Sequence, residues 1–195
     1  MKNTLVISAY TCCGKTYASK YIEDYRILDL NINDFKQTER LPNDEEIEKE
    51  RKRWKSTLRL MSVESHLNKF KNELIRVNNP DFPDNFIQYI KKNIGKVDVI
   101  FVDSDIRIRR LLDETKIKFI TIYPYNDCLQ EWIGRMYLCG QHDLIIKNRI
   151  NDWHYKMKEP LGDDIFRLSY GEYINEKIIE KCFTLGYGVN KKEEQ

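Results

Sequence analysis

The sequence has little net charge, no long apolar run and no pattern of paired cysteines. Its 195 residues include 33 Lys or Arg and 31 Asp or Glu side chains, a formal net charge of +2. A nearly balanced charge argues against a general nucleic-acid-binding or membrane-binding surface. No apolar run approaches the length of a transmembrane helix, and the N-terminus leads into a strand rather than into the apolar region of a signal peptide.

Cysteine usage indicates the compartment. Two of the five cysteines are adjacent, which does not fit a disulfide framework; the five are Cys12, Cys13, Cys128, Cys139 and Cys182. Such usage suits a reducing cytosol, so we expect a cytoplasmic protein. The length, the 41% hydrophobic content and the lack of internal repeats predict a single domain over 1–195. We expect its charged end, 191–195, to fray.

The most informative stretch is Ser8–Thr16, which reads Ser-Ala-Tyr-Thr-Cys-Cys-Gly-Lys-Thr. It follows the apolar run 4–7, which predicts a buried strand, and it precedes 17–22, which has helical spacing. Strand, tight loop and helix are the context of a phosphate-binding loop, and G-x-x-x-x-G-K-[ST] is met except that Ala9 replaces the first glycine. The alternative, a chance Gly-Lys-Thr in a surface turn, fits this position poorly.

Each residue that the pattern specifies has a chemical role. Gly14 lets the backbone approach a phosphate, while loop N–H groups and the helix dipole favour an anion. Lys15 can reach the β- and γ-phosphates, and the Thr16 hydroxyl can coordinate Mg²⁺. These residues predict a site for a nucleoside triphosphate with its metal.

Two acidic residues follow predicted strands. Asp29 ends the strand 26–29, and Asp103 ends the strand 97–103. Ligands of open parallel sheets lie beyond the carboxyl ends of the strands, so Asp29 and Asn31 are expected on the same edge as the loop. Asp29 is interpreted as a Mg²⁺ partner, a base or a substrate anchor, with a strand end before a helix cap as the alternative.

Asp103 suggests a second metal ligand. An apolar strand ending in an acid resembles the Walker B arrangement, in which the acid holds Mg²⁺ directly or through water. We therefore predict Thr16 and Asp103 as the metal residues. The alternative is that Asp103 or Ser104 only caps the helix that begins at Ile106.

The order of elements predicts an α/β fold. The expected strands are 4–7, 26–29, 97–103, 118–123 and 165–168. The expected helices are 17–22, an amphipathic stretch from 43 to 74, 84–93, 106–113, one capped by Asn126 and reaching 138, 143–158 and 172–185. Alternating strands and helices imply a parallel five-stranded sheet with helices on both faces. The basic run 49–59 is most simply a solvated helix face.

Two stretches resemble a known family, the small P-loop kinases of the nucleoside and nucleotide kinase type, especially a phage and bacterial set. They are Ser8–Thr16 and Asn79–Ile87, the latter continuing through Ile90-Lys91 to the strand 99–102 and Arg109. The resemblance implies a three-layer P-loop NTPase fold. It also implies that 34–93 is a helical substrate-flap insertion and that 126–160 is a helical lid region.

The resemblance assigns further roles. Glu131 and Arg135 stand in the lid helix, so Arg135 is expected to close over the phosphates. Three positions depart from the family: Thr11-Cys12 replaces Pro-Gly, Asp103-Ser104-Asp105 replaces serines and a histidine, and Cys139 replaces a second lid arginine. Thr11-Cys12 makes the loop less free to take positive φ. Cys12 and Cys13 beside Lys15 are expected to have lowered thiol pKa values, which would suit a redox-sensitive loop; the alternative is small-residue filling.

These observations predict an ATP-dependent phosphotransferase that acts on a nucleoside or nucleoside monophosphate, with ATP and Mg²⁺ as cofactors. The catalytic residues would be Lys15, Asp29 and Arg135. The ATP-binding residues would be Ala9, Tyr10, Thr11, Cys12, Cys13, Gly14, Lys15 and Thr16. One alternative is an ATP-binding switch without phosphotransfer. The other is a kinase of a modified base in DNA; the basic run 49–59 favours it, and the low net charge argues against it.

Overall fold

The computed structural model describes residues 3–56, 62–158 and 164–191. The chain divides into two compact units. The larger unit combines Met1–Ile32 with Phe86–Gln195, and the smaller unit is Asn33–Asn85. The smaller unit starts one residue before the predicted insertion 34–93 and ends at Asn85, so the last segment of that insertion belongs to the larger unit.

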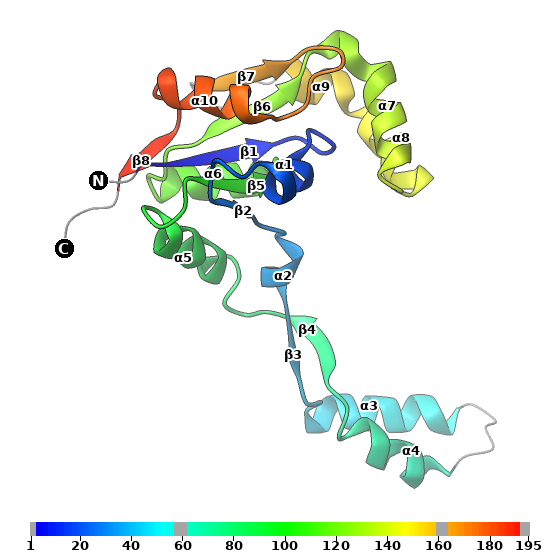
Figure 1. Ribbon diagram of the computed structural model, residues 1–195. Coiled ribbons are helices and arrows are strands. Elements are labelled where there is room, and N and C mark those ends of the chain that lie inside the picture. Colours follow the sequence, from blue (N-terminus) through cyan, green and yellow to red (C-terminus); the bar gives the residue numbers. More distant parts are fainter. Residues whose placement is uncertain (1–2, 57–61, 159–163, 192–195) are drawn as a thin grey trace. The chain divides into compact units, whose positions relative to one another are not determined.

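A mostly parallel sheet forms the centre of the larger unit (Figure 1). Its order is β2-β5-β1-β6-β7, and every neighbouring pair on this path is parallel. The strands are β1 (Asn3–Ala9), β2 (Ile27–Asp29), β5 (Val99–Asp103), β6 (Ile120–Pro124) and β7 (Ile165–Leu168). The predicted five parallel strands are thereby confirmed.

A sixth strand, β8 (Val189–Lys191), was not predicted. It pairs antiparallel with the first residues of β1, from Asn3 to Leu5, while β6 pairs with β1 further along, from Ile7 to Ala9. A three-residue polar strand has too little alternation to be recognised in the sequence. Its pairing orders Lys191, which had been expected to belong to the frayed end; residues 192–195 lie outside the described part.

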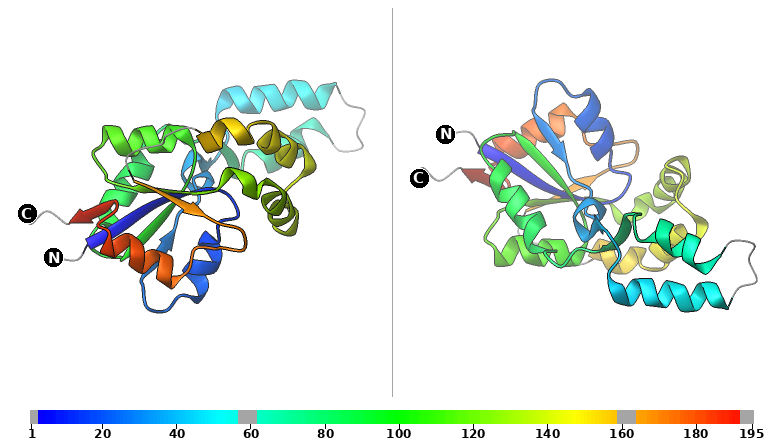
Figure 2. Two further views of the ribbon diagram at one scale, coloured as in Figure 1. Left: turned by 90° about the horizontal axis from the view of Figure 1, so that it is seen from above. Right: turned by 90° about the horizontal axis from the view of Figure 1, so that it is seen from below.

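Helices cover both faces of this sheet (Figure 2). On one face lie α1 (Lys15–Tyr21) and α10 (Glu176–Thr184), and on the other lie α5 (Asp84–Asn93) and α6 (Ile106–Glu114). A 3₁₀ turn η1 (Asn126–Cys128) leads into α7 (Leu129–Leu138), α8 (Asp143–Asn151) and α9 (Trp153–Lys158). No helix within the described ranges combines the length and the apolar character needed to cross a membrane.

The central strands are apolar on both sides because both faces are covered. Leu5, Val6 and Ile7 of β1 are fully buried, as are the four residues from Val99 to Val102 of β5. This burial explains why both strands were recognisable as continuous apolar runs. The burial ends near the carboxyl end of each strand, where the polar residues begin.

The smaller unit is a two-stranded ribbon carrying a helix pair. A short helix α2 (Asn33–Lys36) leads into β3 (Gln37–Arg40), which pairs antiparallel with β4 (Ile75–Asn78). Between these strands lie α3 (Asp44–Lys55) and α4 (Val63–Phe70). The ribbon was not predicted, because its strands have only four residues each and 34 residues separate them.

The predicted single amphipathic stretch 43–74 is two helices. Asn43 begins α3 with a capping box, since its side chain accepts from the Glu46 N–H and Glu46 accepts from the Asn43 N–H. The Trp54 and His66 rings then stack with centroids 3.5 Å apart, which holds α3 against α4. Leu58, Arg59 and Met61, which continued the predicted pattern, lie outside the described residues.

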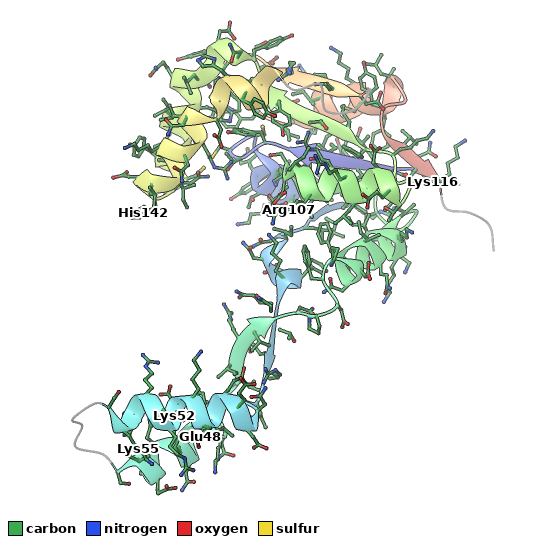
Figure 3. The ribbon with its side chains drawn as sticks, turned by 180° about the vertical axis from the view of Figure 1, so that it is seen from behind. Glu48, Lys52, Lys55, Arg107, Lys116 and His142 are labelled. Carbon is green, nitrogen blue, oxygen red and sulfur yellow. The ribbon has the colours of Figure 1, made fainter. Side chains whose placement is uncertain are left out.

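The basic run of α3 is partly neutralised. Figure 3 labels Glu48, Lys52 and Lys55 on this helix. Arg51 lies 3.3 Å from Glu48, and Arg53 lies 3.6 Å from Glu50. Such pairing fits the interpretation of a solvated face with mixed charge.

Three predicted helix boundaries were wrong. The expected helix 143–158 breaks at Asp152 into α8 and α9, and the expected helix 172–185 starts only at Glu176, capped by Asn175. Asn126 is not the cap of α7; its side-chain oxygen instead lies 3.1 Å from His154 Nδ1. Periodicity locates a helix better than it locates the helix ends.

Candidate functional site

Four of the predicted site residues, Lys15, Thr16, Asp29 and Asp103, meet at the carboxyl ends of three neighbouring strands. Ala9 of β1 lies in register with Asp103 of β5, and Asp29 of β2 lies in register with Phe101. Lys15 and Thr16, which begin α1, each reach one of these acids. This convergence follows from the parallel sheet, whose carboxyl ends share one edge.

Lys15 is paired with Asp103. Its ammonium Nζ lies 2.6 Å from Asp103 Oδ1 and also donates to the Val102 carbonyl at 3.4 Å. The Lys15 side chain is 13% exposed and the Asp103 side chain 42% exposed. The Lys15 ammonium is therefore largely buried, and it is paired with a carboxylate that is partly exposed to solvent.

Thr16 is bonded to Asp29. The Thr16 hydroxyl donates to Asp29 Oδ2 at 3.0 Å. The alternative interpretation of Asp103 or Ser104 as the cap of α6 is wrong, since Asp105 is the cap and accepts from the Arg107 N–H at 2.9 Å. Asp103 therefore does not cap α6, and its side chain instead contacts Lys15.

Two residues of the β1–α1 loop, 10–14, have the left-handed backbone conformation. Gly14 has φ 98° and Cys12 has φ 60°. Cys12 takes positive φ although it is not glycine, contrary to the expectation that Thr11-Cys12 would restrict the loop. A methyl group on Gly14 would lie 3.3 Å from Tyr173 Cβ, so both the backbone and the packing favour glycine there.

Contacts from distant segments hold this loop. The Trp132 indole N–H donates to the Thr11 carbonyl at 2.9 Å, and the Ile174 N–H donates to the Cys13 carbonyl at 2.8 Å. Gln141 Nε2 donates to Thr11 Oγ1 at 2.8 Å. The loop is therefore fixed by α7, by the α7–α8 turn and by the β7–α10 segment. These contacts join residues more than a hundred positions apart, so no local pattern indicates them.

Arg135 is part of that support and is buried. Its guanidinium is paired with Glu131, with Nε 3.0 Å from Oε1, and its side chain is 3% exposed. It lies 3.9 Å from the Trp132 ring centroid and 3.6 Å from that of Tyr173. The structure shows no contact of Arg135 with Lys15 or Asp29; its guanidinium lies against the Trp132 and Tyr173 rings.

The other loop residues are largely enclosed. Ala9 and Tyr10 are each 1% exposed, and the Tyr10 ring lies 5.3 Å from that of Tyr123. Burial raises the pKa of the Tyr10 hydroxyl. Burial also raises the pKa of Cys12 to about 11 and raises that of Cys13, so the expected lowering of both thiol pKa values beside Lys15 is wrong.

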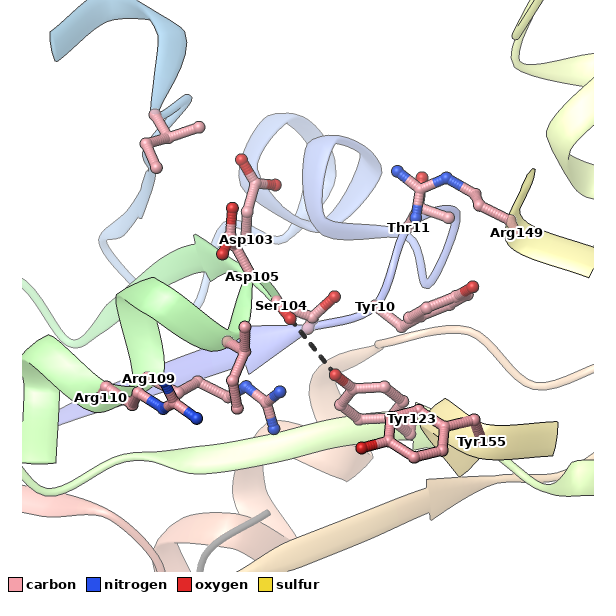
Figure 4. A pocket seen from close by; sticks show the side chains of 13 residues that line it. Tyr10, Thr11, Asp103, Ser104, Asp105, Arg109, Arg110, Tyr123, Arg149 and Tyr155 are labelled. Carbon is pink, nitrogen blue, oxygen red and sulfur yellow. Dashed lines mark hydrogen bonds between the residues drawn. The ribbon is translucent and has the colours of Figure 1, made fainter. Parts of the chain in front are cut away.

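Two cavities open on either side of Asp103 and Thr11. One, of about 610 Å³, is lined by the segment from Thr11 to Tyr17 and by Cys139, Gln141, Tyr173, Ile174 and Asn175. The other, of about 660 Å³, is lined by polar and aromatic side chains (Figure 4). We call them the loop cavity and the arginine cavity.

The arginine cavity is named for three of its residues, Arg109, Arg110 and Arg149. Arg109 approaches from α6 and Arg149 from α8 (Figure 4). The Arg149 guanidinium carbon lies 5.7 Å from the Tyr10 ring centroid, and its Nε is buried with no hydrogen-bond partner in the described structure. From the sequence, Arg109 was named only as part of the family resemblance and Arg149 was not singled out, because nothing local marks either residue as lining a cavity.

Comparison with protein-family models and with curated proteins gave no match. Functional interpretation therefore depends on the geometry of the site. Its oxygen donors, the Thr16 hydroxyl and the Asp29 and Asp103 carboxylates, are of the kind that Mg²⁺ prefers.

Proposed function

We propose that the protein is an ATP-dependent phosphotransferase of the P-loop kinase type, with a nucleoside monophosphate as its acceptor. One observation carries the proposal: a left-handed loop, an ammonium, a hydroxyl and two carboxylates converge at the carboxyl edge of a parallel sheet, between two cavities. Phosphoryl transfer needs positioning and charge stabilisation more than covalent chemistry, and these groups supply both.

Lys15 and Thr16 would act at the donor. Lys15 exchanges its contact with Asp103 for the phosphates and stabilises the charge that develops on the transferring group. The loop residues from Ala9 to Thr16 hold the triphosphate, whose remainder fits the apolar loop cavity beside Tyr17 and Tyr173. The contacts from Trp132 and Ile174 keep the loop in position.

The residues present fit a magnesium ion. Thr16, Asp103 and Asp29 would hold it directly or through water, and the ion would neutralise phosphate charge during transfer. Asp29 contacts Thr16 and is not one of the described residues that line either cavity, which favours an orienting role over acceptance of the acceptor's proton.

The arginine cavity supports an anionic acceptor. Its three arginines exceed its two acids, Asp103 and Asp105, and Asp105 is already bonded to Arg107. Guanidinium groups bind phosphate bidentately, and Arg149 has a buried nitrogen to satisfy. This composition favours a monophosphate over an uncharged nucleoside.

Arg149 is a better candidate than Arg135 for closing over the phosphates. Arg135 is enclosed by Glu131, Trp132 and Tyr173. It packs against Trp132, which donates a hydrogen bond to the loop. Arg149 stands on α8 at the edge of the arginine cavity, within the lid region 126–160. We keep the lid role proposed for this region and assign it to Arg149 in place of Arg135.

ADP formation tests the proposal. Wild-type protein with MgATP is incubated with each nucleoside and each nucleoside monophosphate, and we expect acceptor-dependent ADP only with monophosphates. Lys15→Ala is expected to abolish it, while Lys20→Ala, on the exposed side of the same helix, keeps it. Unchanged turnover of Lys15→Ala would remove the loop assignment.

The alternatives predict other outcomes. ATP binding without ADP formation for any acceptor would indicate a nucleotide-binding switch. Retention on DNA with a steep salt dependence would indicate a kinase of a modified base, although Arg51 and Arg53 of the basic run are already paired with acids.

A further inference from the structure

Two cysteines from distant segments meet at the wall of the loop cavity. Cys12 lies in the β1–α1 loop, and Cys139 follows α7 as its exposed C-cap residue. The chain reverses at Gly140, with φ 68°, and returns Gln141 to the loop. Gln141 Nε2 lies 3.6 Å from Cys12 Sγ and 2.8 Å from Thr11 Oγ1.

The two thiols are close enough to influence each other. The neighbouring Cys139 thiol contributes to the raised pKa of Cys12, which is about 11 and is caused mainly by burial. Both cysteines line the loop cavity together with Gly14, Lys15 and Thr16. Any bond between them would therefore be made beside the proposed triphosphate site.

The remaining cysteines do not compete. Cys13 and Cys182 are fully buried and Cys128 is 4% exposed. Cys12 is half-buried and Cys139 is exposed, so this pair alone among the five is open to a reagent from solution. All five lie within the described residues.

We propose that Cys12 and Cys139 form a reversible disulfide that closes the loop cavity to nucleotide. The bond itself rests on the cavity wall that the two cysteines share and on the Gln141 contact between their segments, whereas its effect on nucleotide rests on the proposed function. It would join the loop to the α7–α8 turn, which the Gln141 contact already brings together.

A low-molecular-weight disulfide supplies the oxidant. The exposed Cys139 thiolate attacks it, forms a mixed disulfide and releases one thiolate. Cys12 then loses its proton and attacks Cys139 Sγ, forming the internal bond and expelling the second thiolate. The protein thereby loses two electrons and two protons, and the reagent is reduced to two thiols.

Nucleotide and disulfide would exclude each other. A crosslinked loop cannot adjust around a triphosphate, and a bound triphosphate holds the Cys12 backbone in place and covers the cavity. We therefore expect ATP to slow crosslinking and crosslinking to remove ATP binding.

The test uses the full chain and oxidised glutathione. Free thiols are blocked, and the protein is digested and mapped by mass spectrometry. We expect loss of two hydrogen atoms from the intact mass and a single crosslinked peptide pair containing Cys12 and Cys139. Absence of this pair from folded protein, or a crosslink involving another cysteine, would overturn the proposal.

The second readout is the ATP-induced rise in the thermal unfolding midpoint. We expect oxidation to abolish this rise and dithiothreitol to restore it. Cys139→Ser serves as the matched variant, and its ATP-induced rise is expected to be the same before and after oxidation. An unchanged rise in the crosslinked wild type would overturn the proposed closure.

Failure of the proposed function would look different. In that case the reduced wild type would show no ATP-induced rise, yet the Cys12–Cys139 crosslink would still form. The mapped bond and the nucleotide response thus report on the two proposals separately.

Discussion

Replacement of Asp103 by Asn separates two proposed roles of this carboxylate. Asp103 holds Lys15 at 2.6 Å and is also proposed to hold Mg²⁺. Asn keeps the shape of the side chain but removes the charge. Without metal, the Asp103→Asn protein no longer has to release Lys15 from an ion pair before ATP binds. With metal, it lacks a ligand.

The size of the first effect follows from exposure. A hydrogen bond to a charged group contributes roughly 1.5–3 kcal/mol when it is buried, but exposed ion pairs contribute only about 0.2–1 kcal/mol. Because Asp103 is 42% exposed and Lys15 13% exposed, we take about 1 kcal/mol, which is about fivefold in affinity.

The assay is calorimetric titration with ATP, once in EDTA and once in saturating Mg²⁺. We expect Asp103→Asn to bind about fivefold more tightly than wild type in EDTA and more weakly in Mg²⁺. Asp105→Asn is the matched control: Asp105 caps α6 and bonds to Arg107, and Asn caps equally well, so its affinity is expected to match that of wild type in both buffers. The same affinity change for Asp103→Asn in both buffers would refute the reasoning.

Three further predictions concern other parts of the molecule. Asp29→Asn is expected to lower turnover about tenfold to a hundredfold, because it removes a charge proposed to orient the metal, while the unfolding midpoint stays unchanged because the amide oxygen still accepts from the Thr16 hydroxyl; a silent variant would transfer the orienting role to Asp103. Arg135→Ala is expected to cost about 3 kcal/mol in unfolding free energy, measured in urea, since it removes the cation beside the largely buried Glu131 carboxylate and leaves that carboxylate only the Gly171 N–H among the described residues; adding Glu131→Ala should recover part of that loss, and additive losses would contradict the pairing. Gly188→Ala, whose methyl would lie 2.7 Å from backbone atoms, is expected to cost about 1–3 kcal/mol more than Gly186→Ala, where φ is also positive but the space is open; equal costs would contradict this packing.

The central sheet and its edge were predictable because their signals are local. The helix Asp84–Asn93 and the strand Ile165–Leu168 have the predicted bounds, and the apolar strands ending in Asp29 and Asp103 placed both acids at one edge. Parallel pairing then brings the acids toward the loop without any further information.

What could not be predicted depends on contacts between distant residues. The two strands of the β3–β4 ribbon have four residues each and β8 has three, so their alternation is too short to detect. Trp132 supports the loop across 121 residues of sequence. The raised pKa of Cys12 is likewise a consequence of burial, which outweighs the lowering by the Thr11 hydroxyl and by Arg149.

The most direct test of the central claim is a ³¹P NMR time course of MgATP with the accepted monophosphate. If the protein is a phosphotransferase, the γ-phosphate signal of ATP declines as a β-phosphate signal of the acceptor product grows at the same rate, and Lys15→Ala shows neither change. Release of inorganic phosphate in place of a new diphosphate, or an equal time course with Lys15→Ala, would contradict the account.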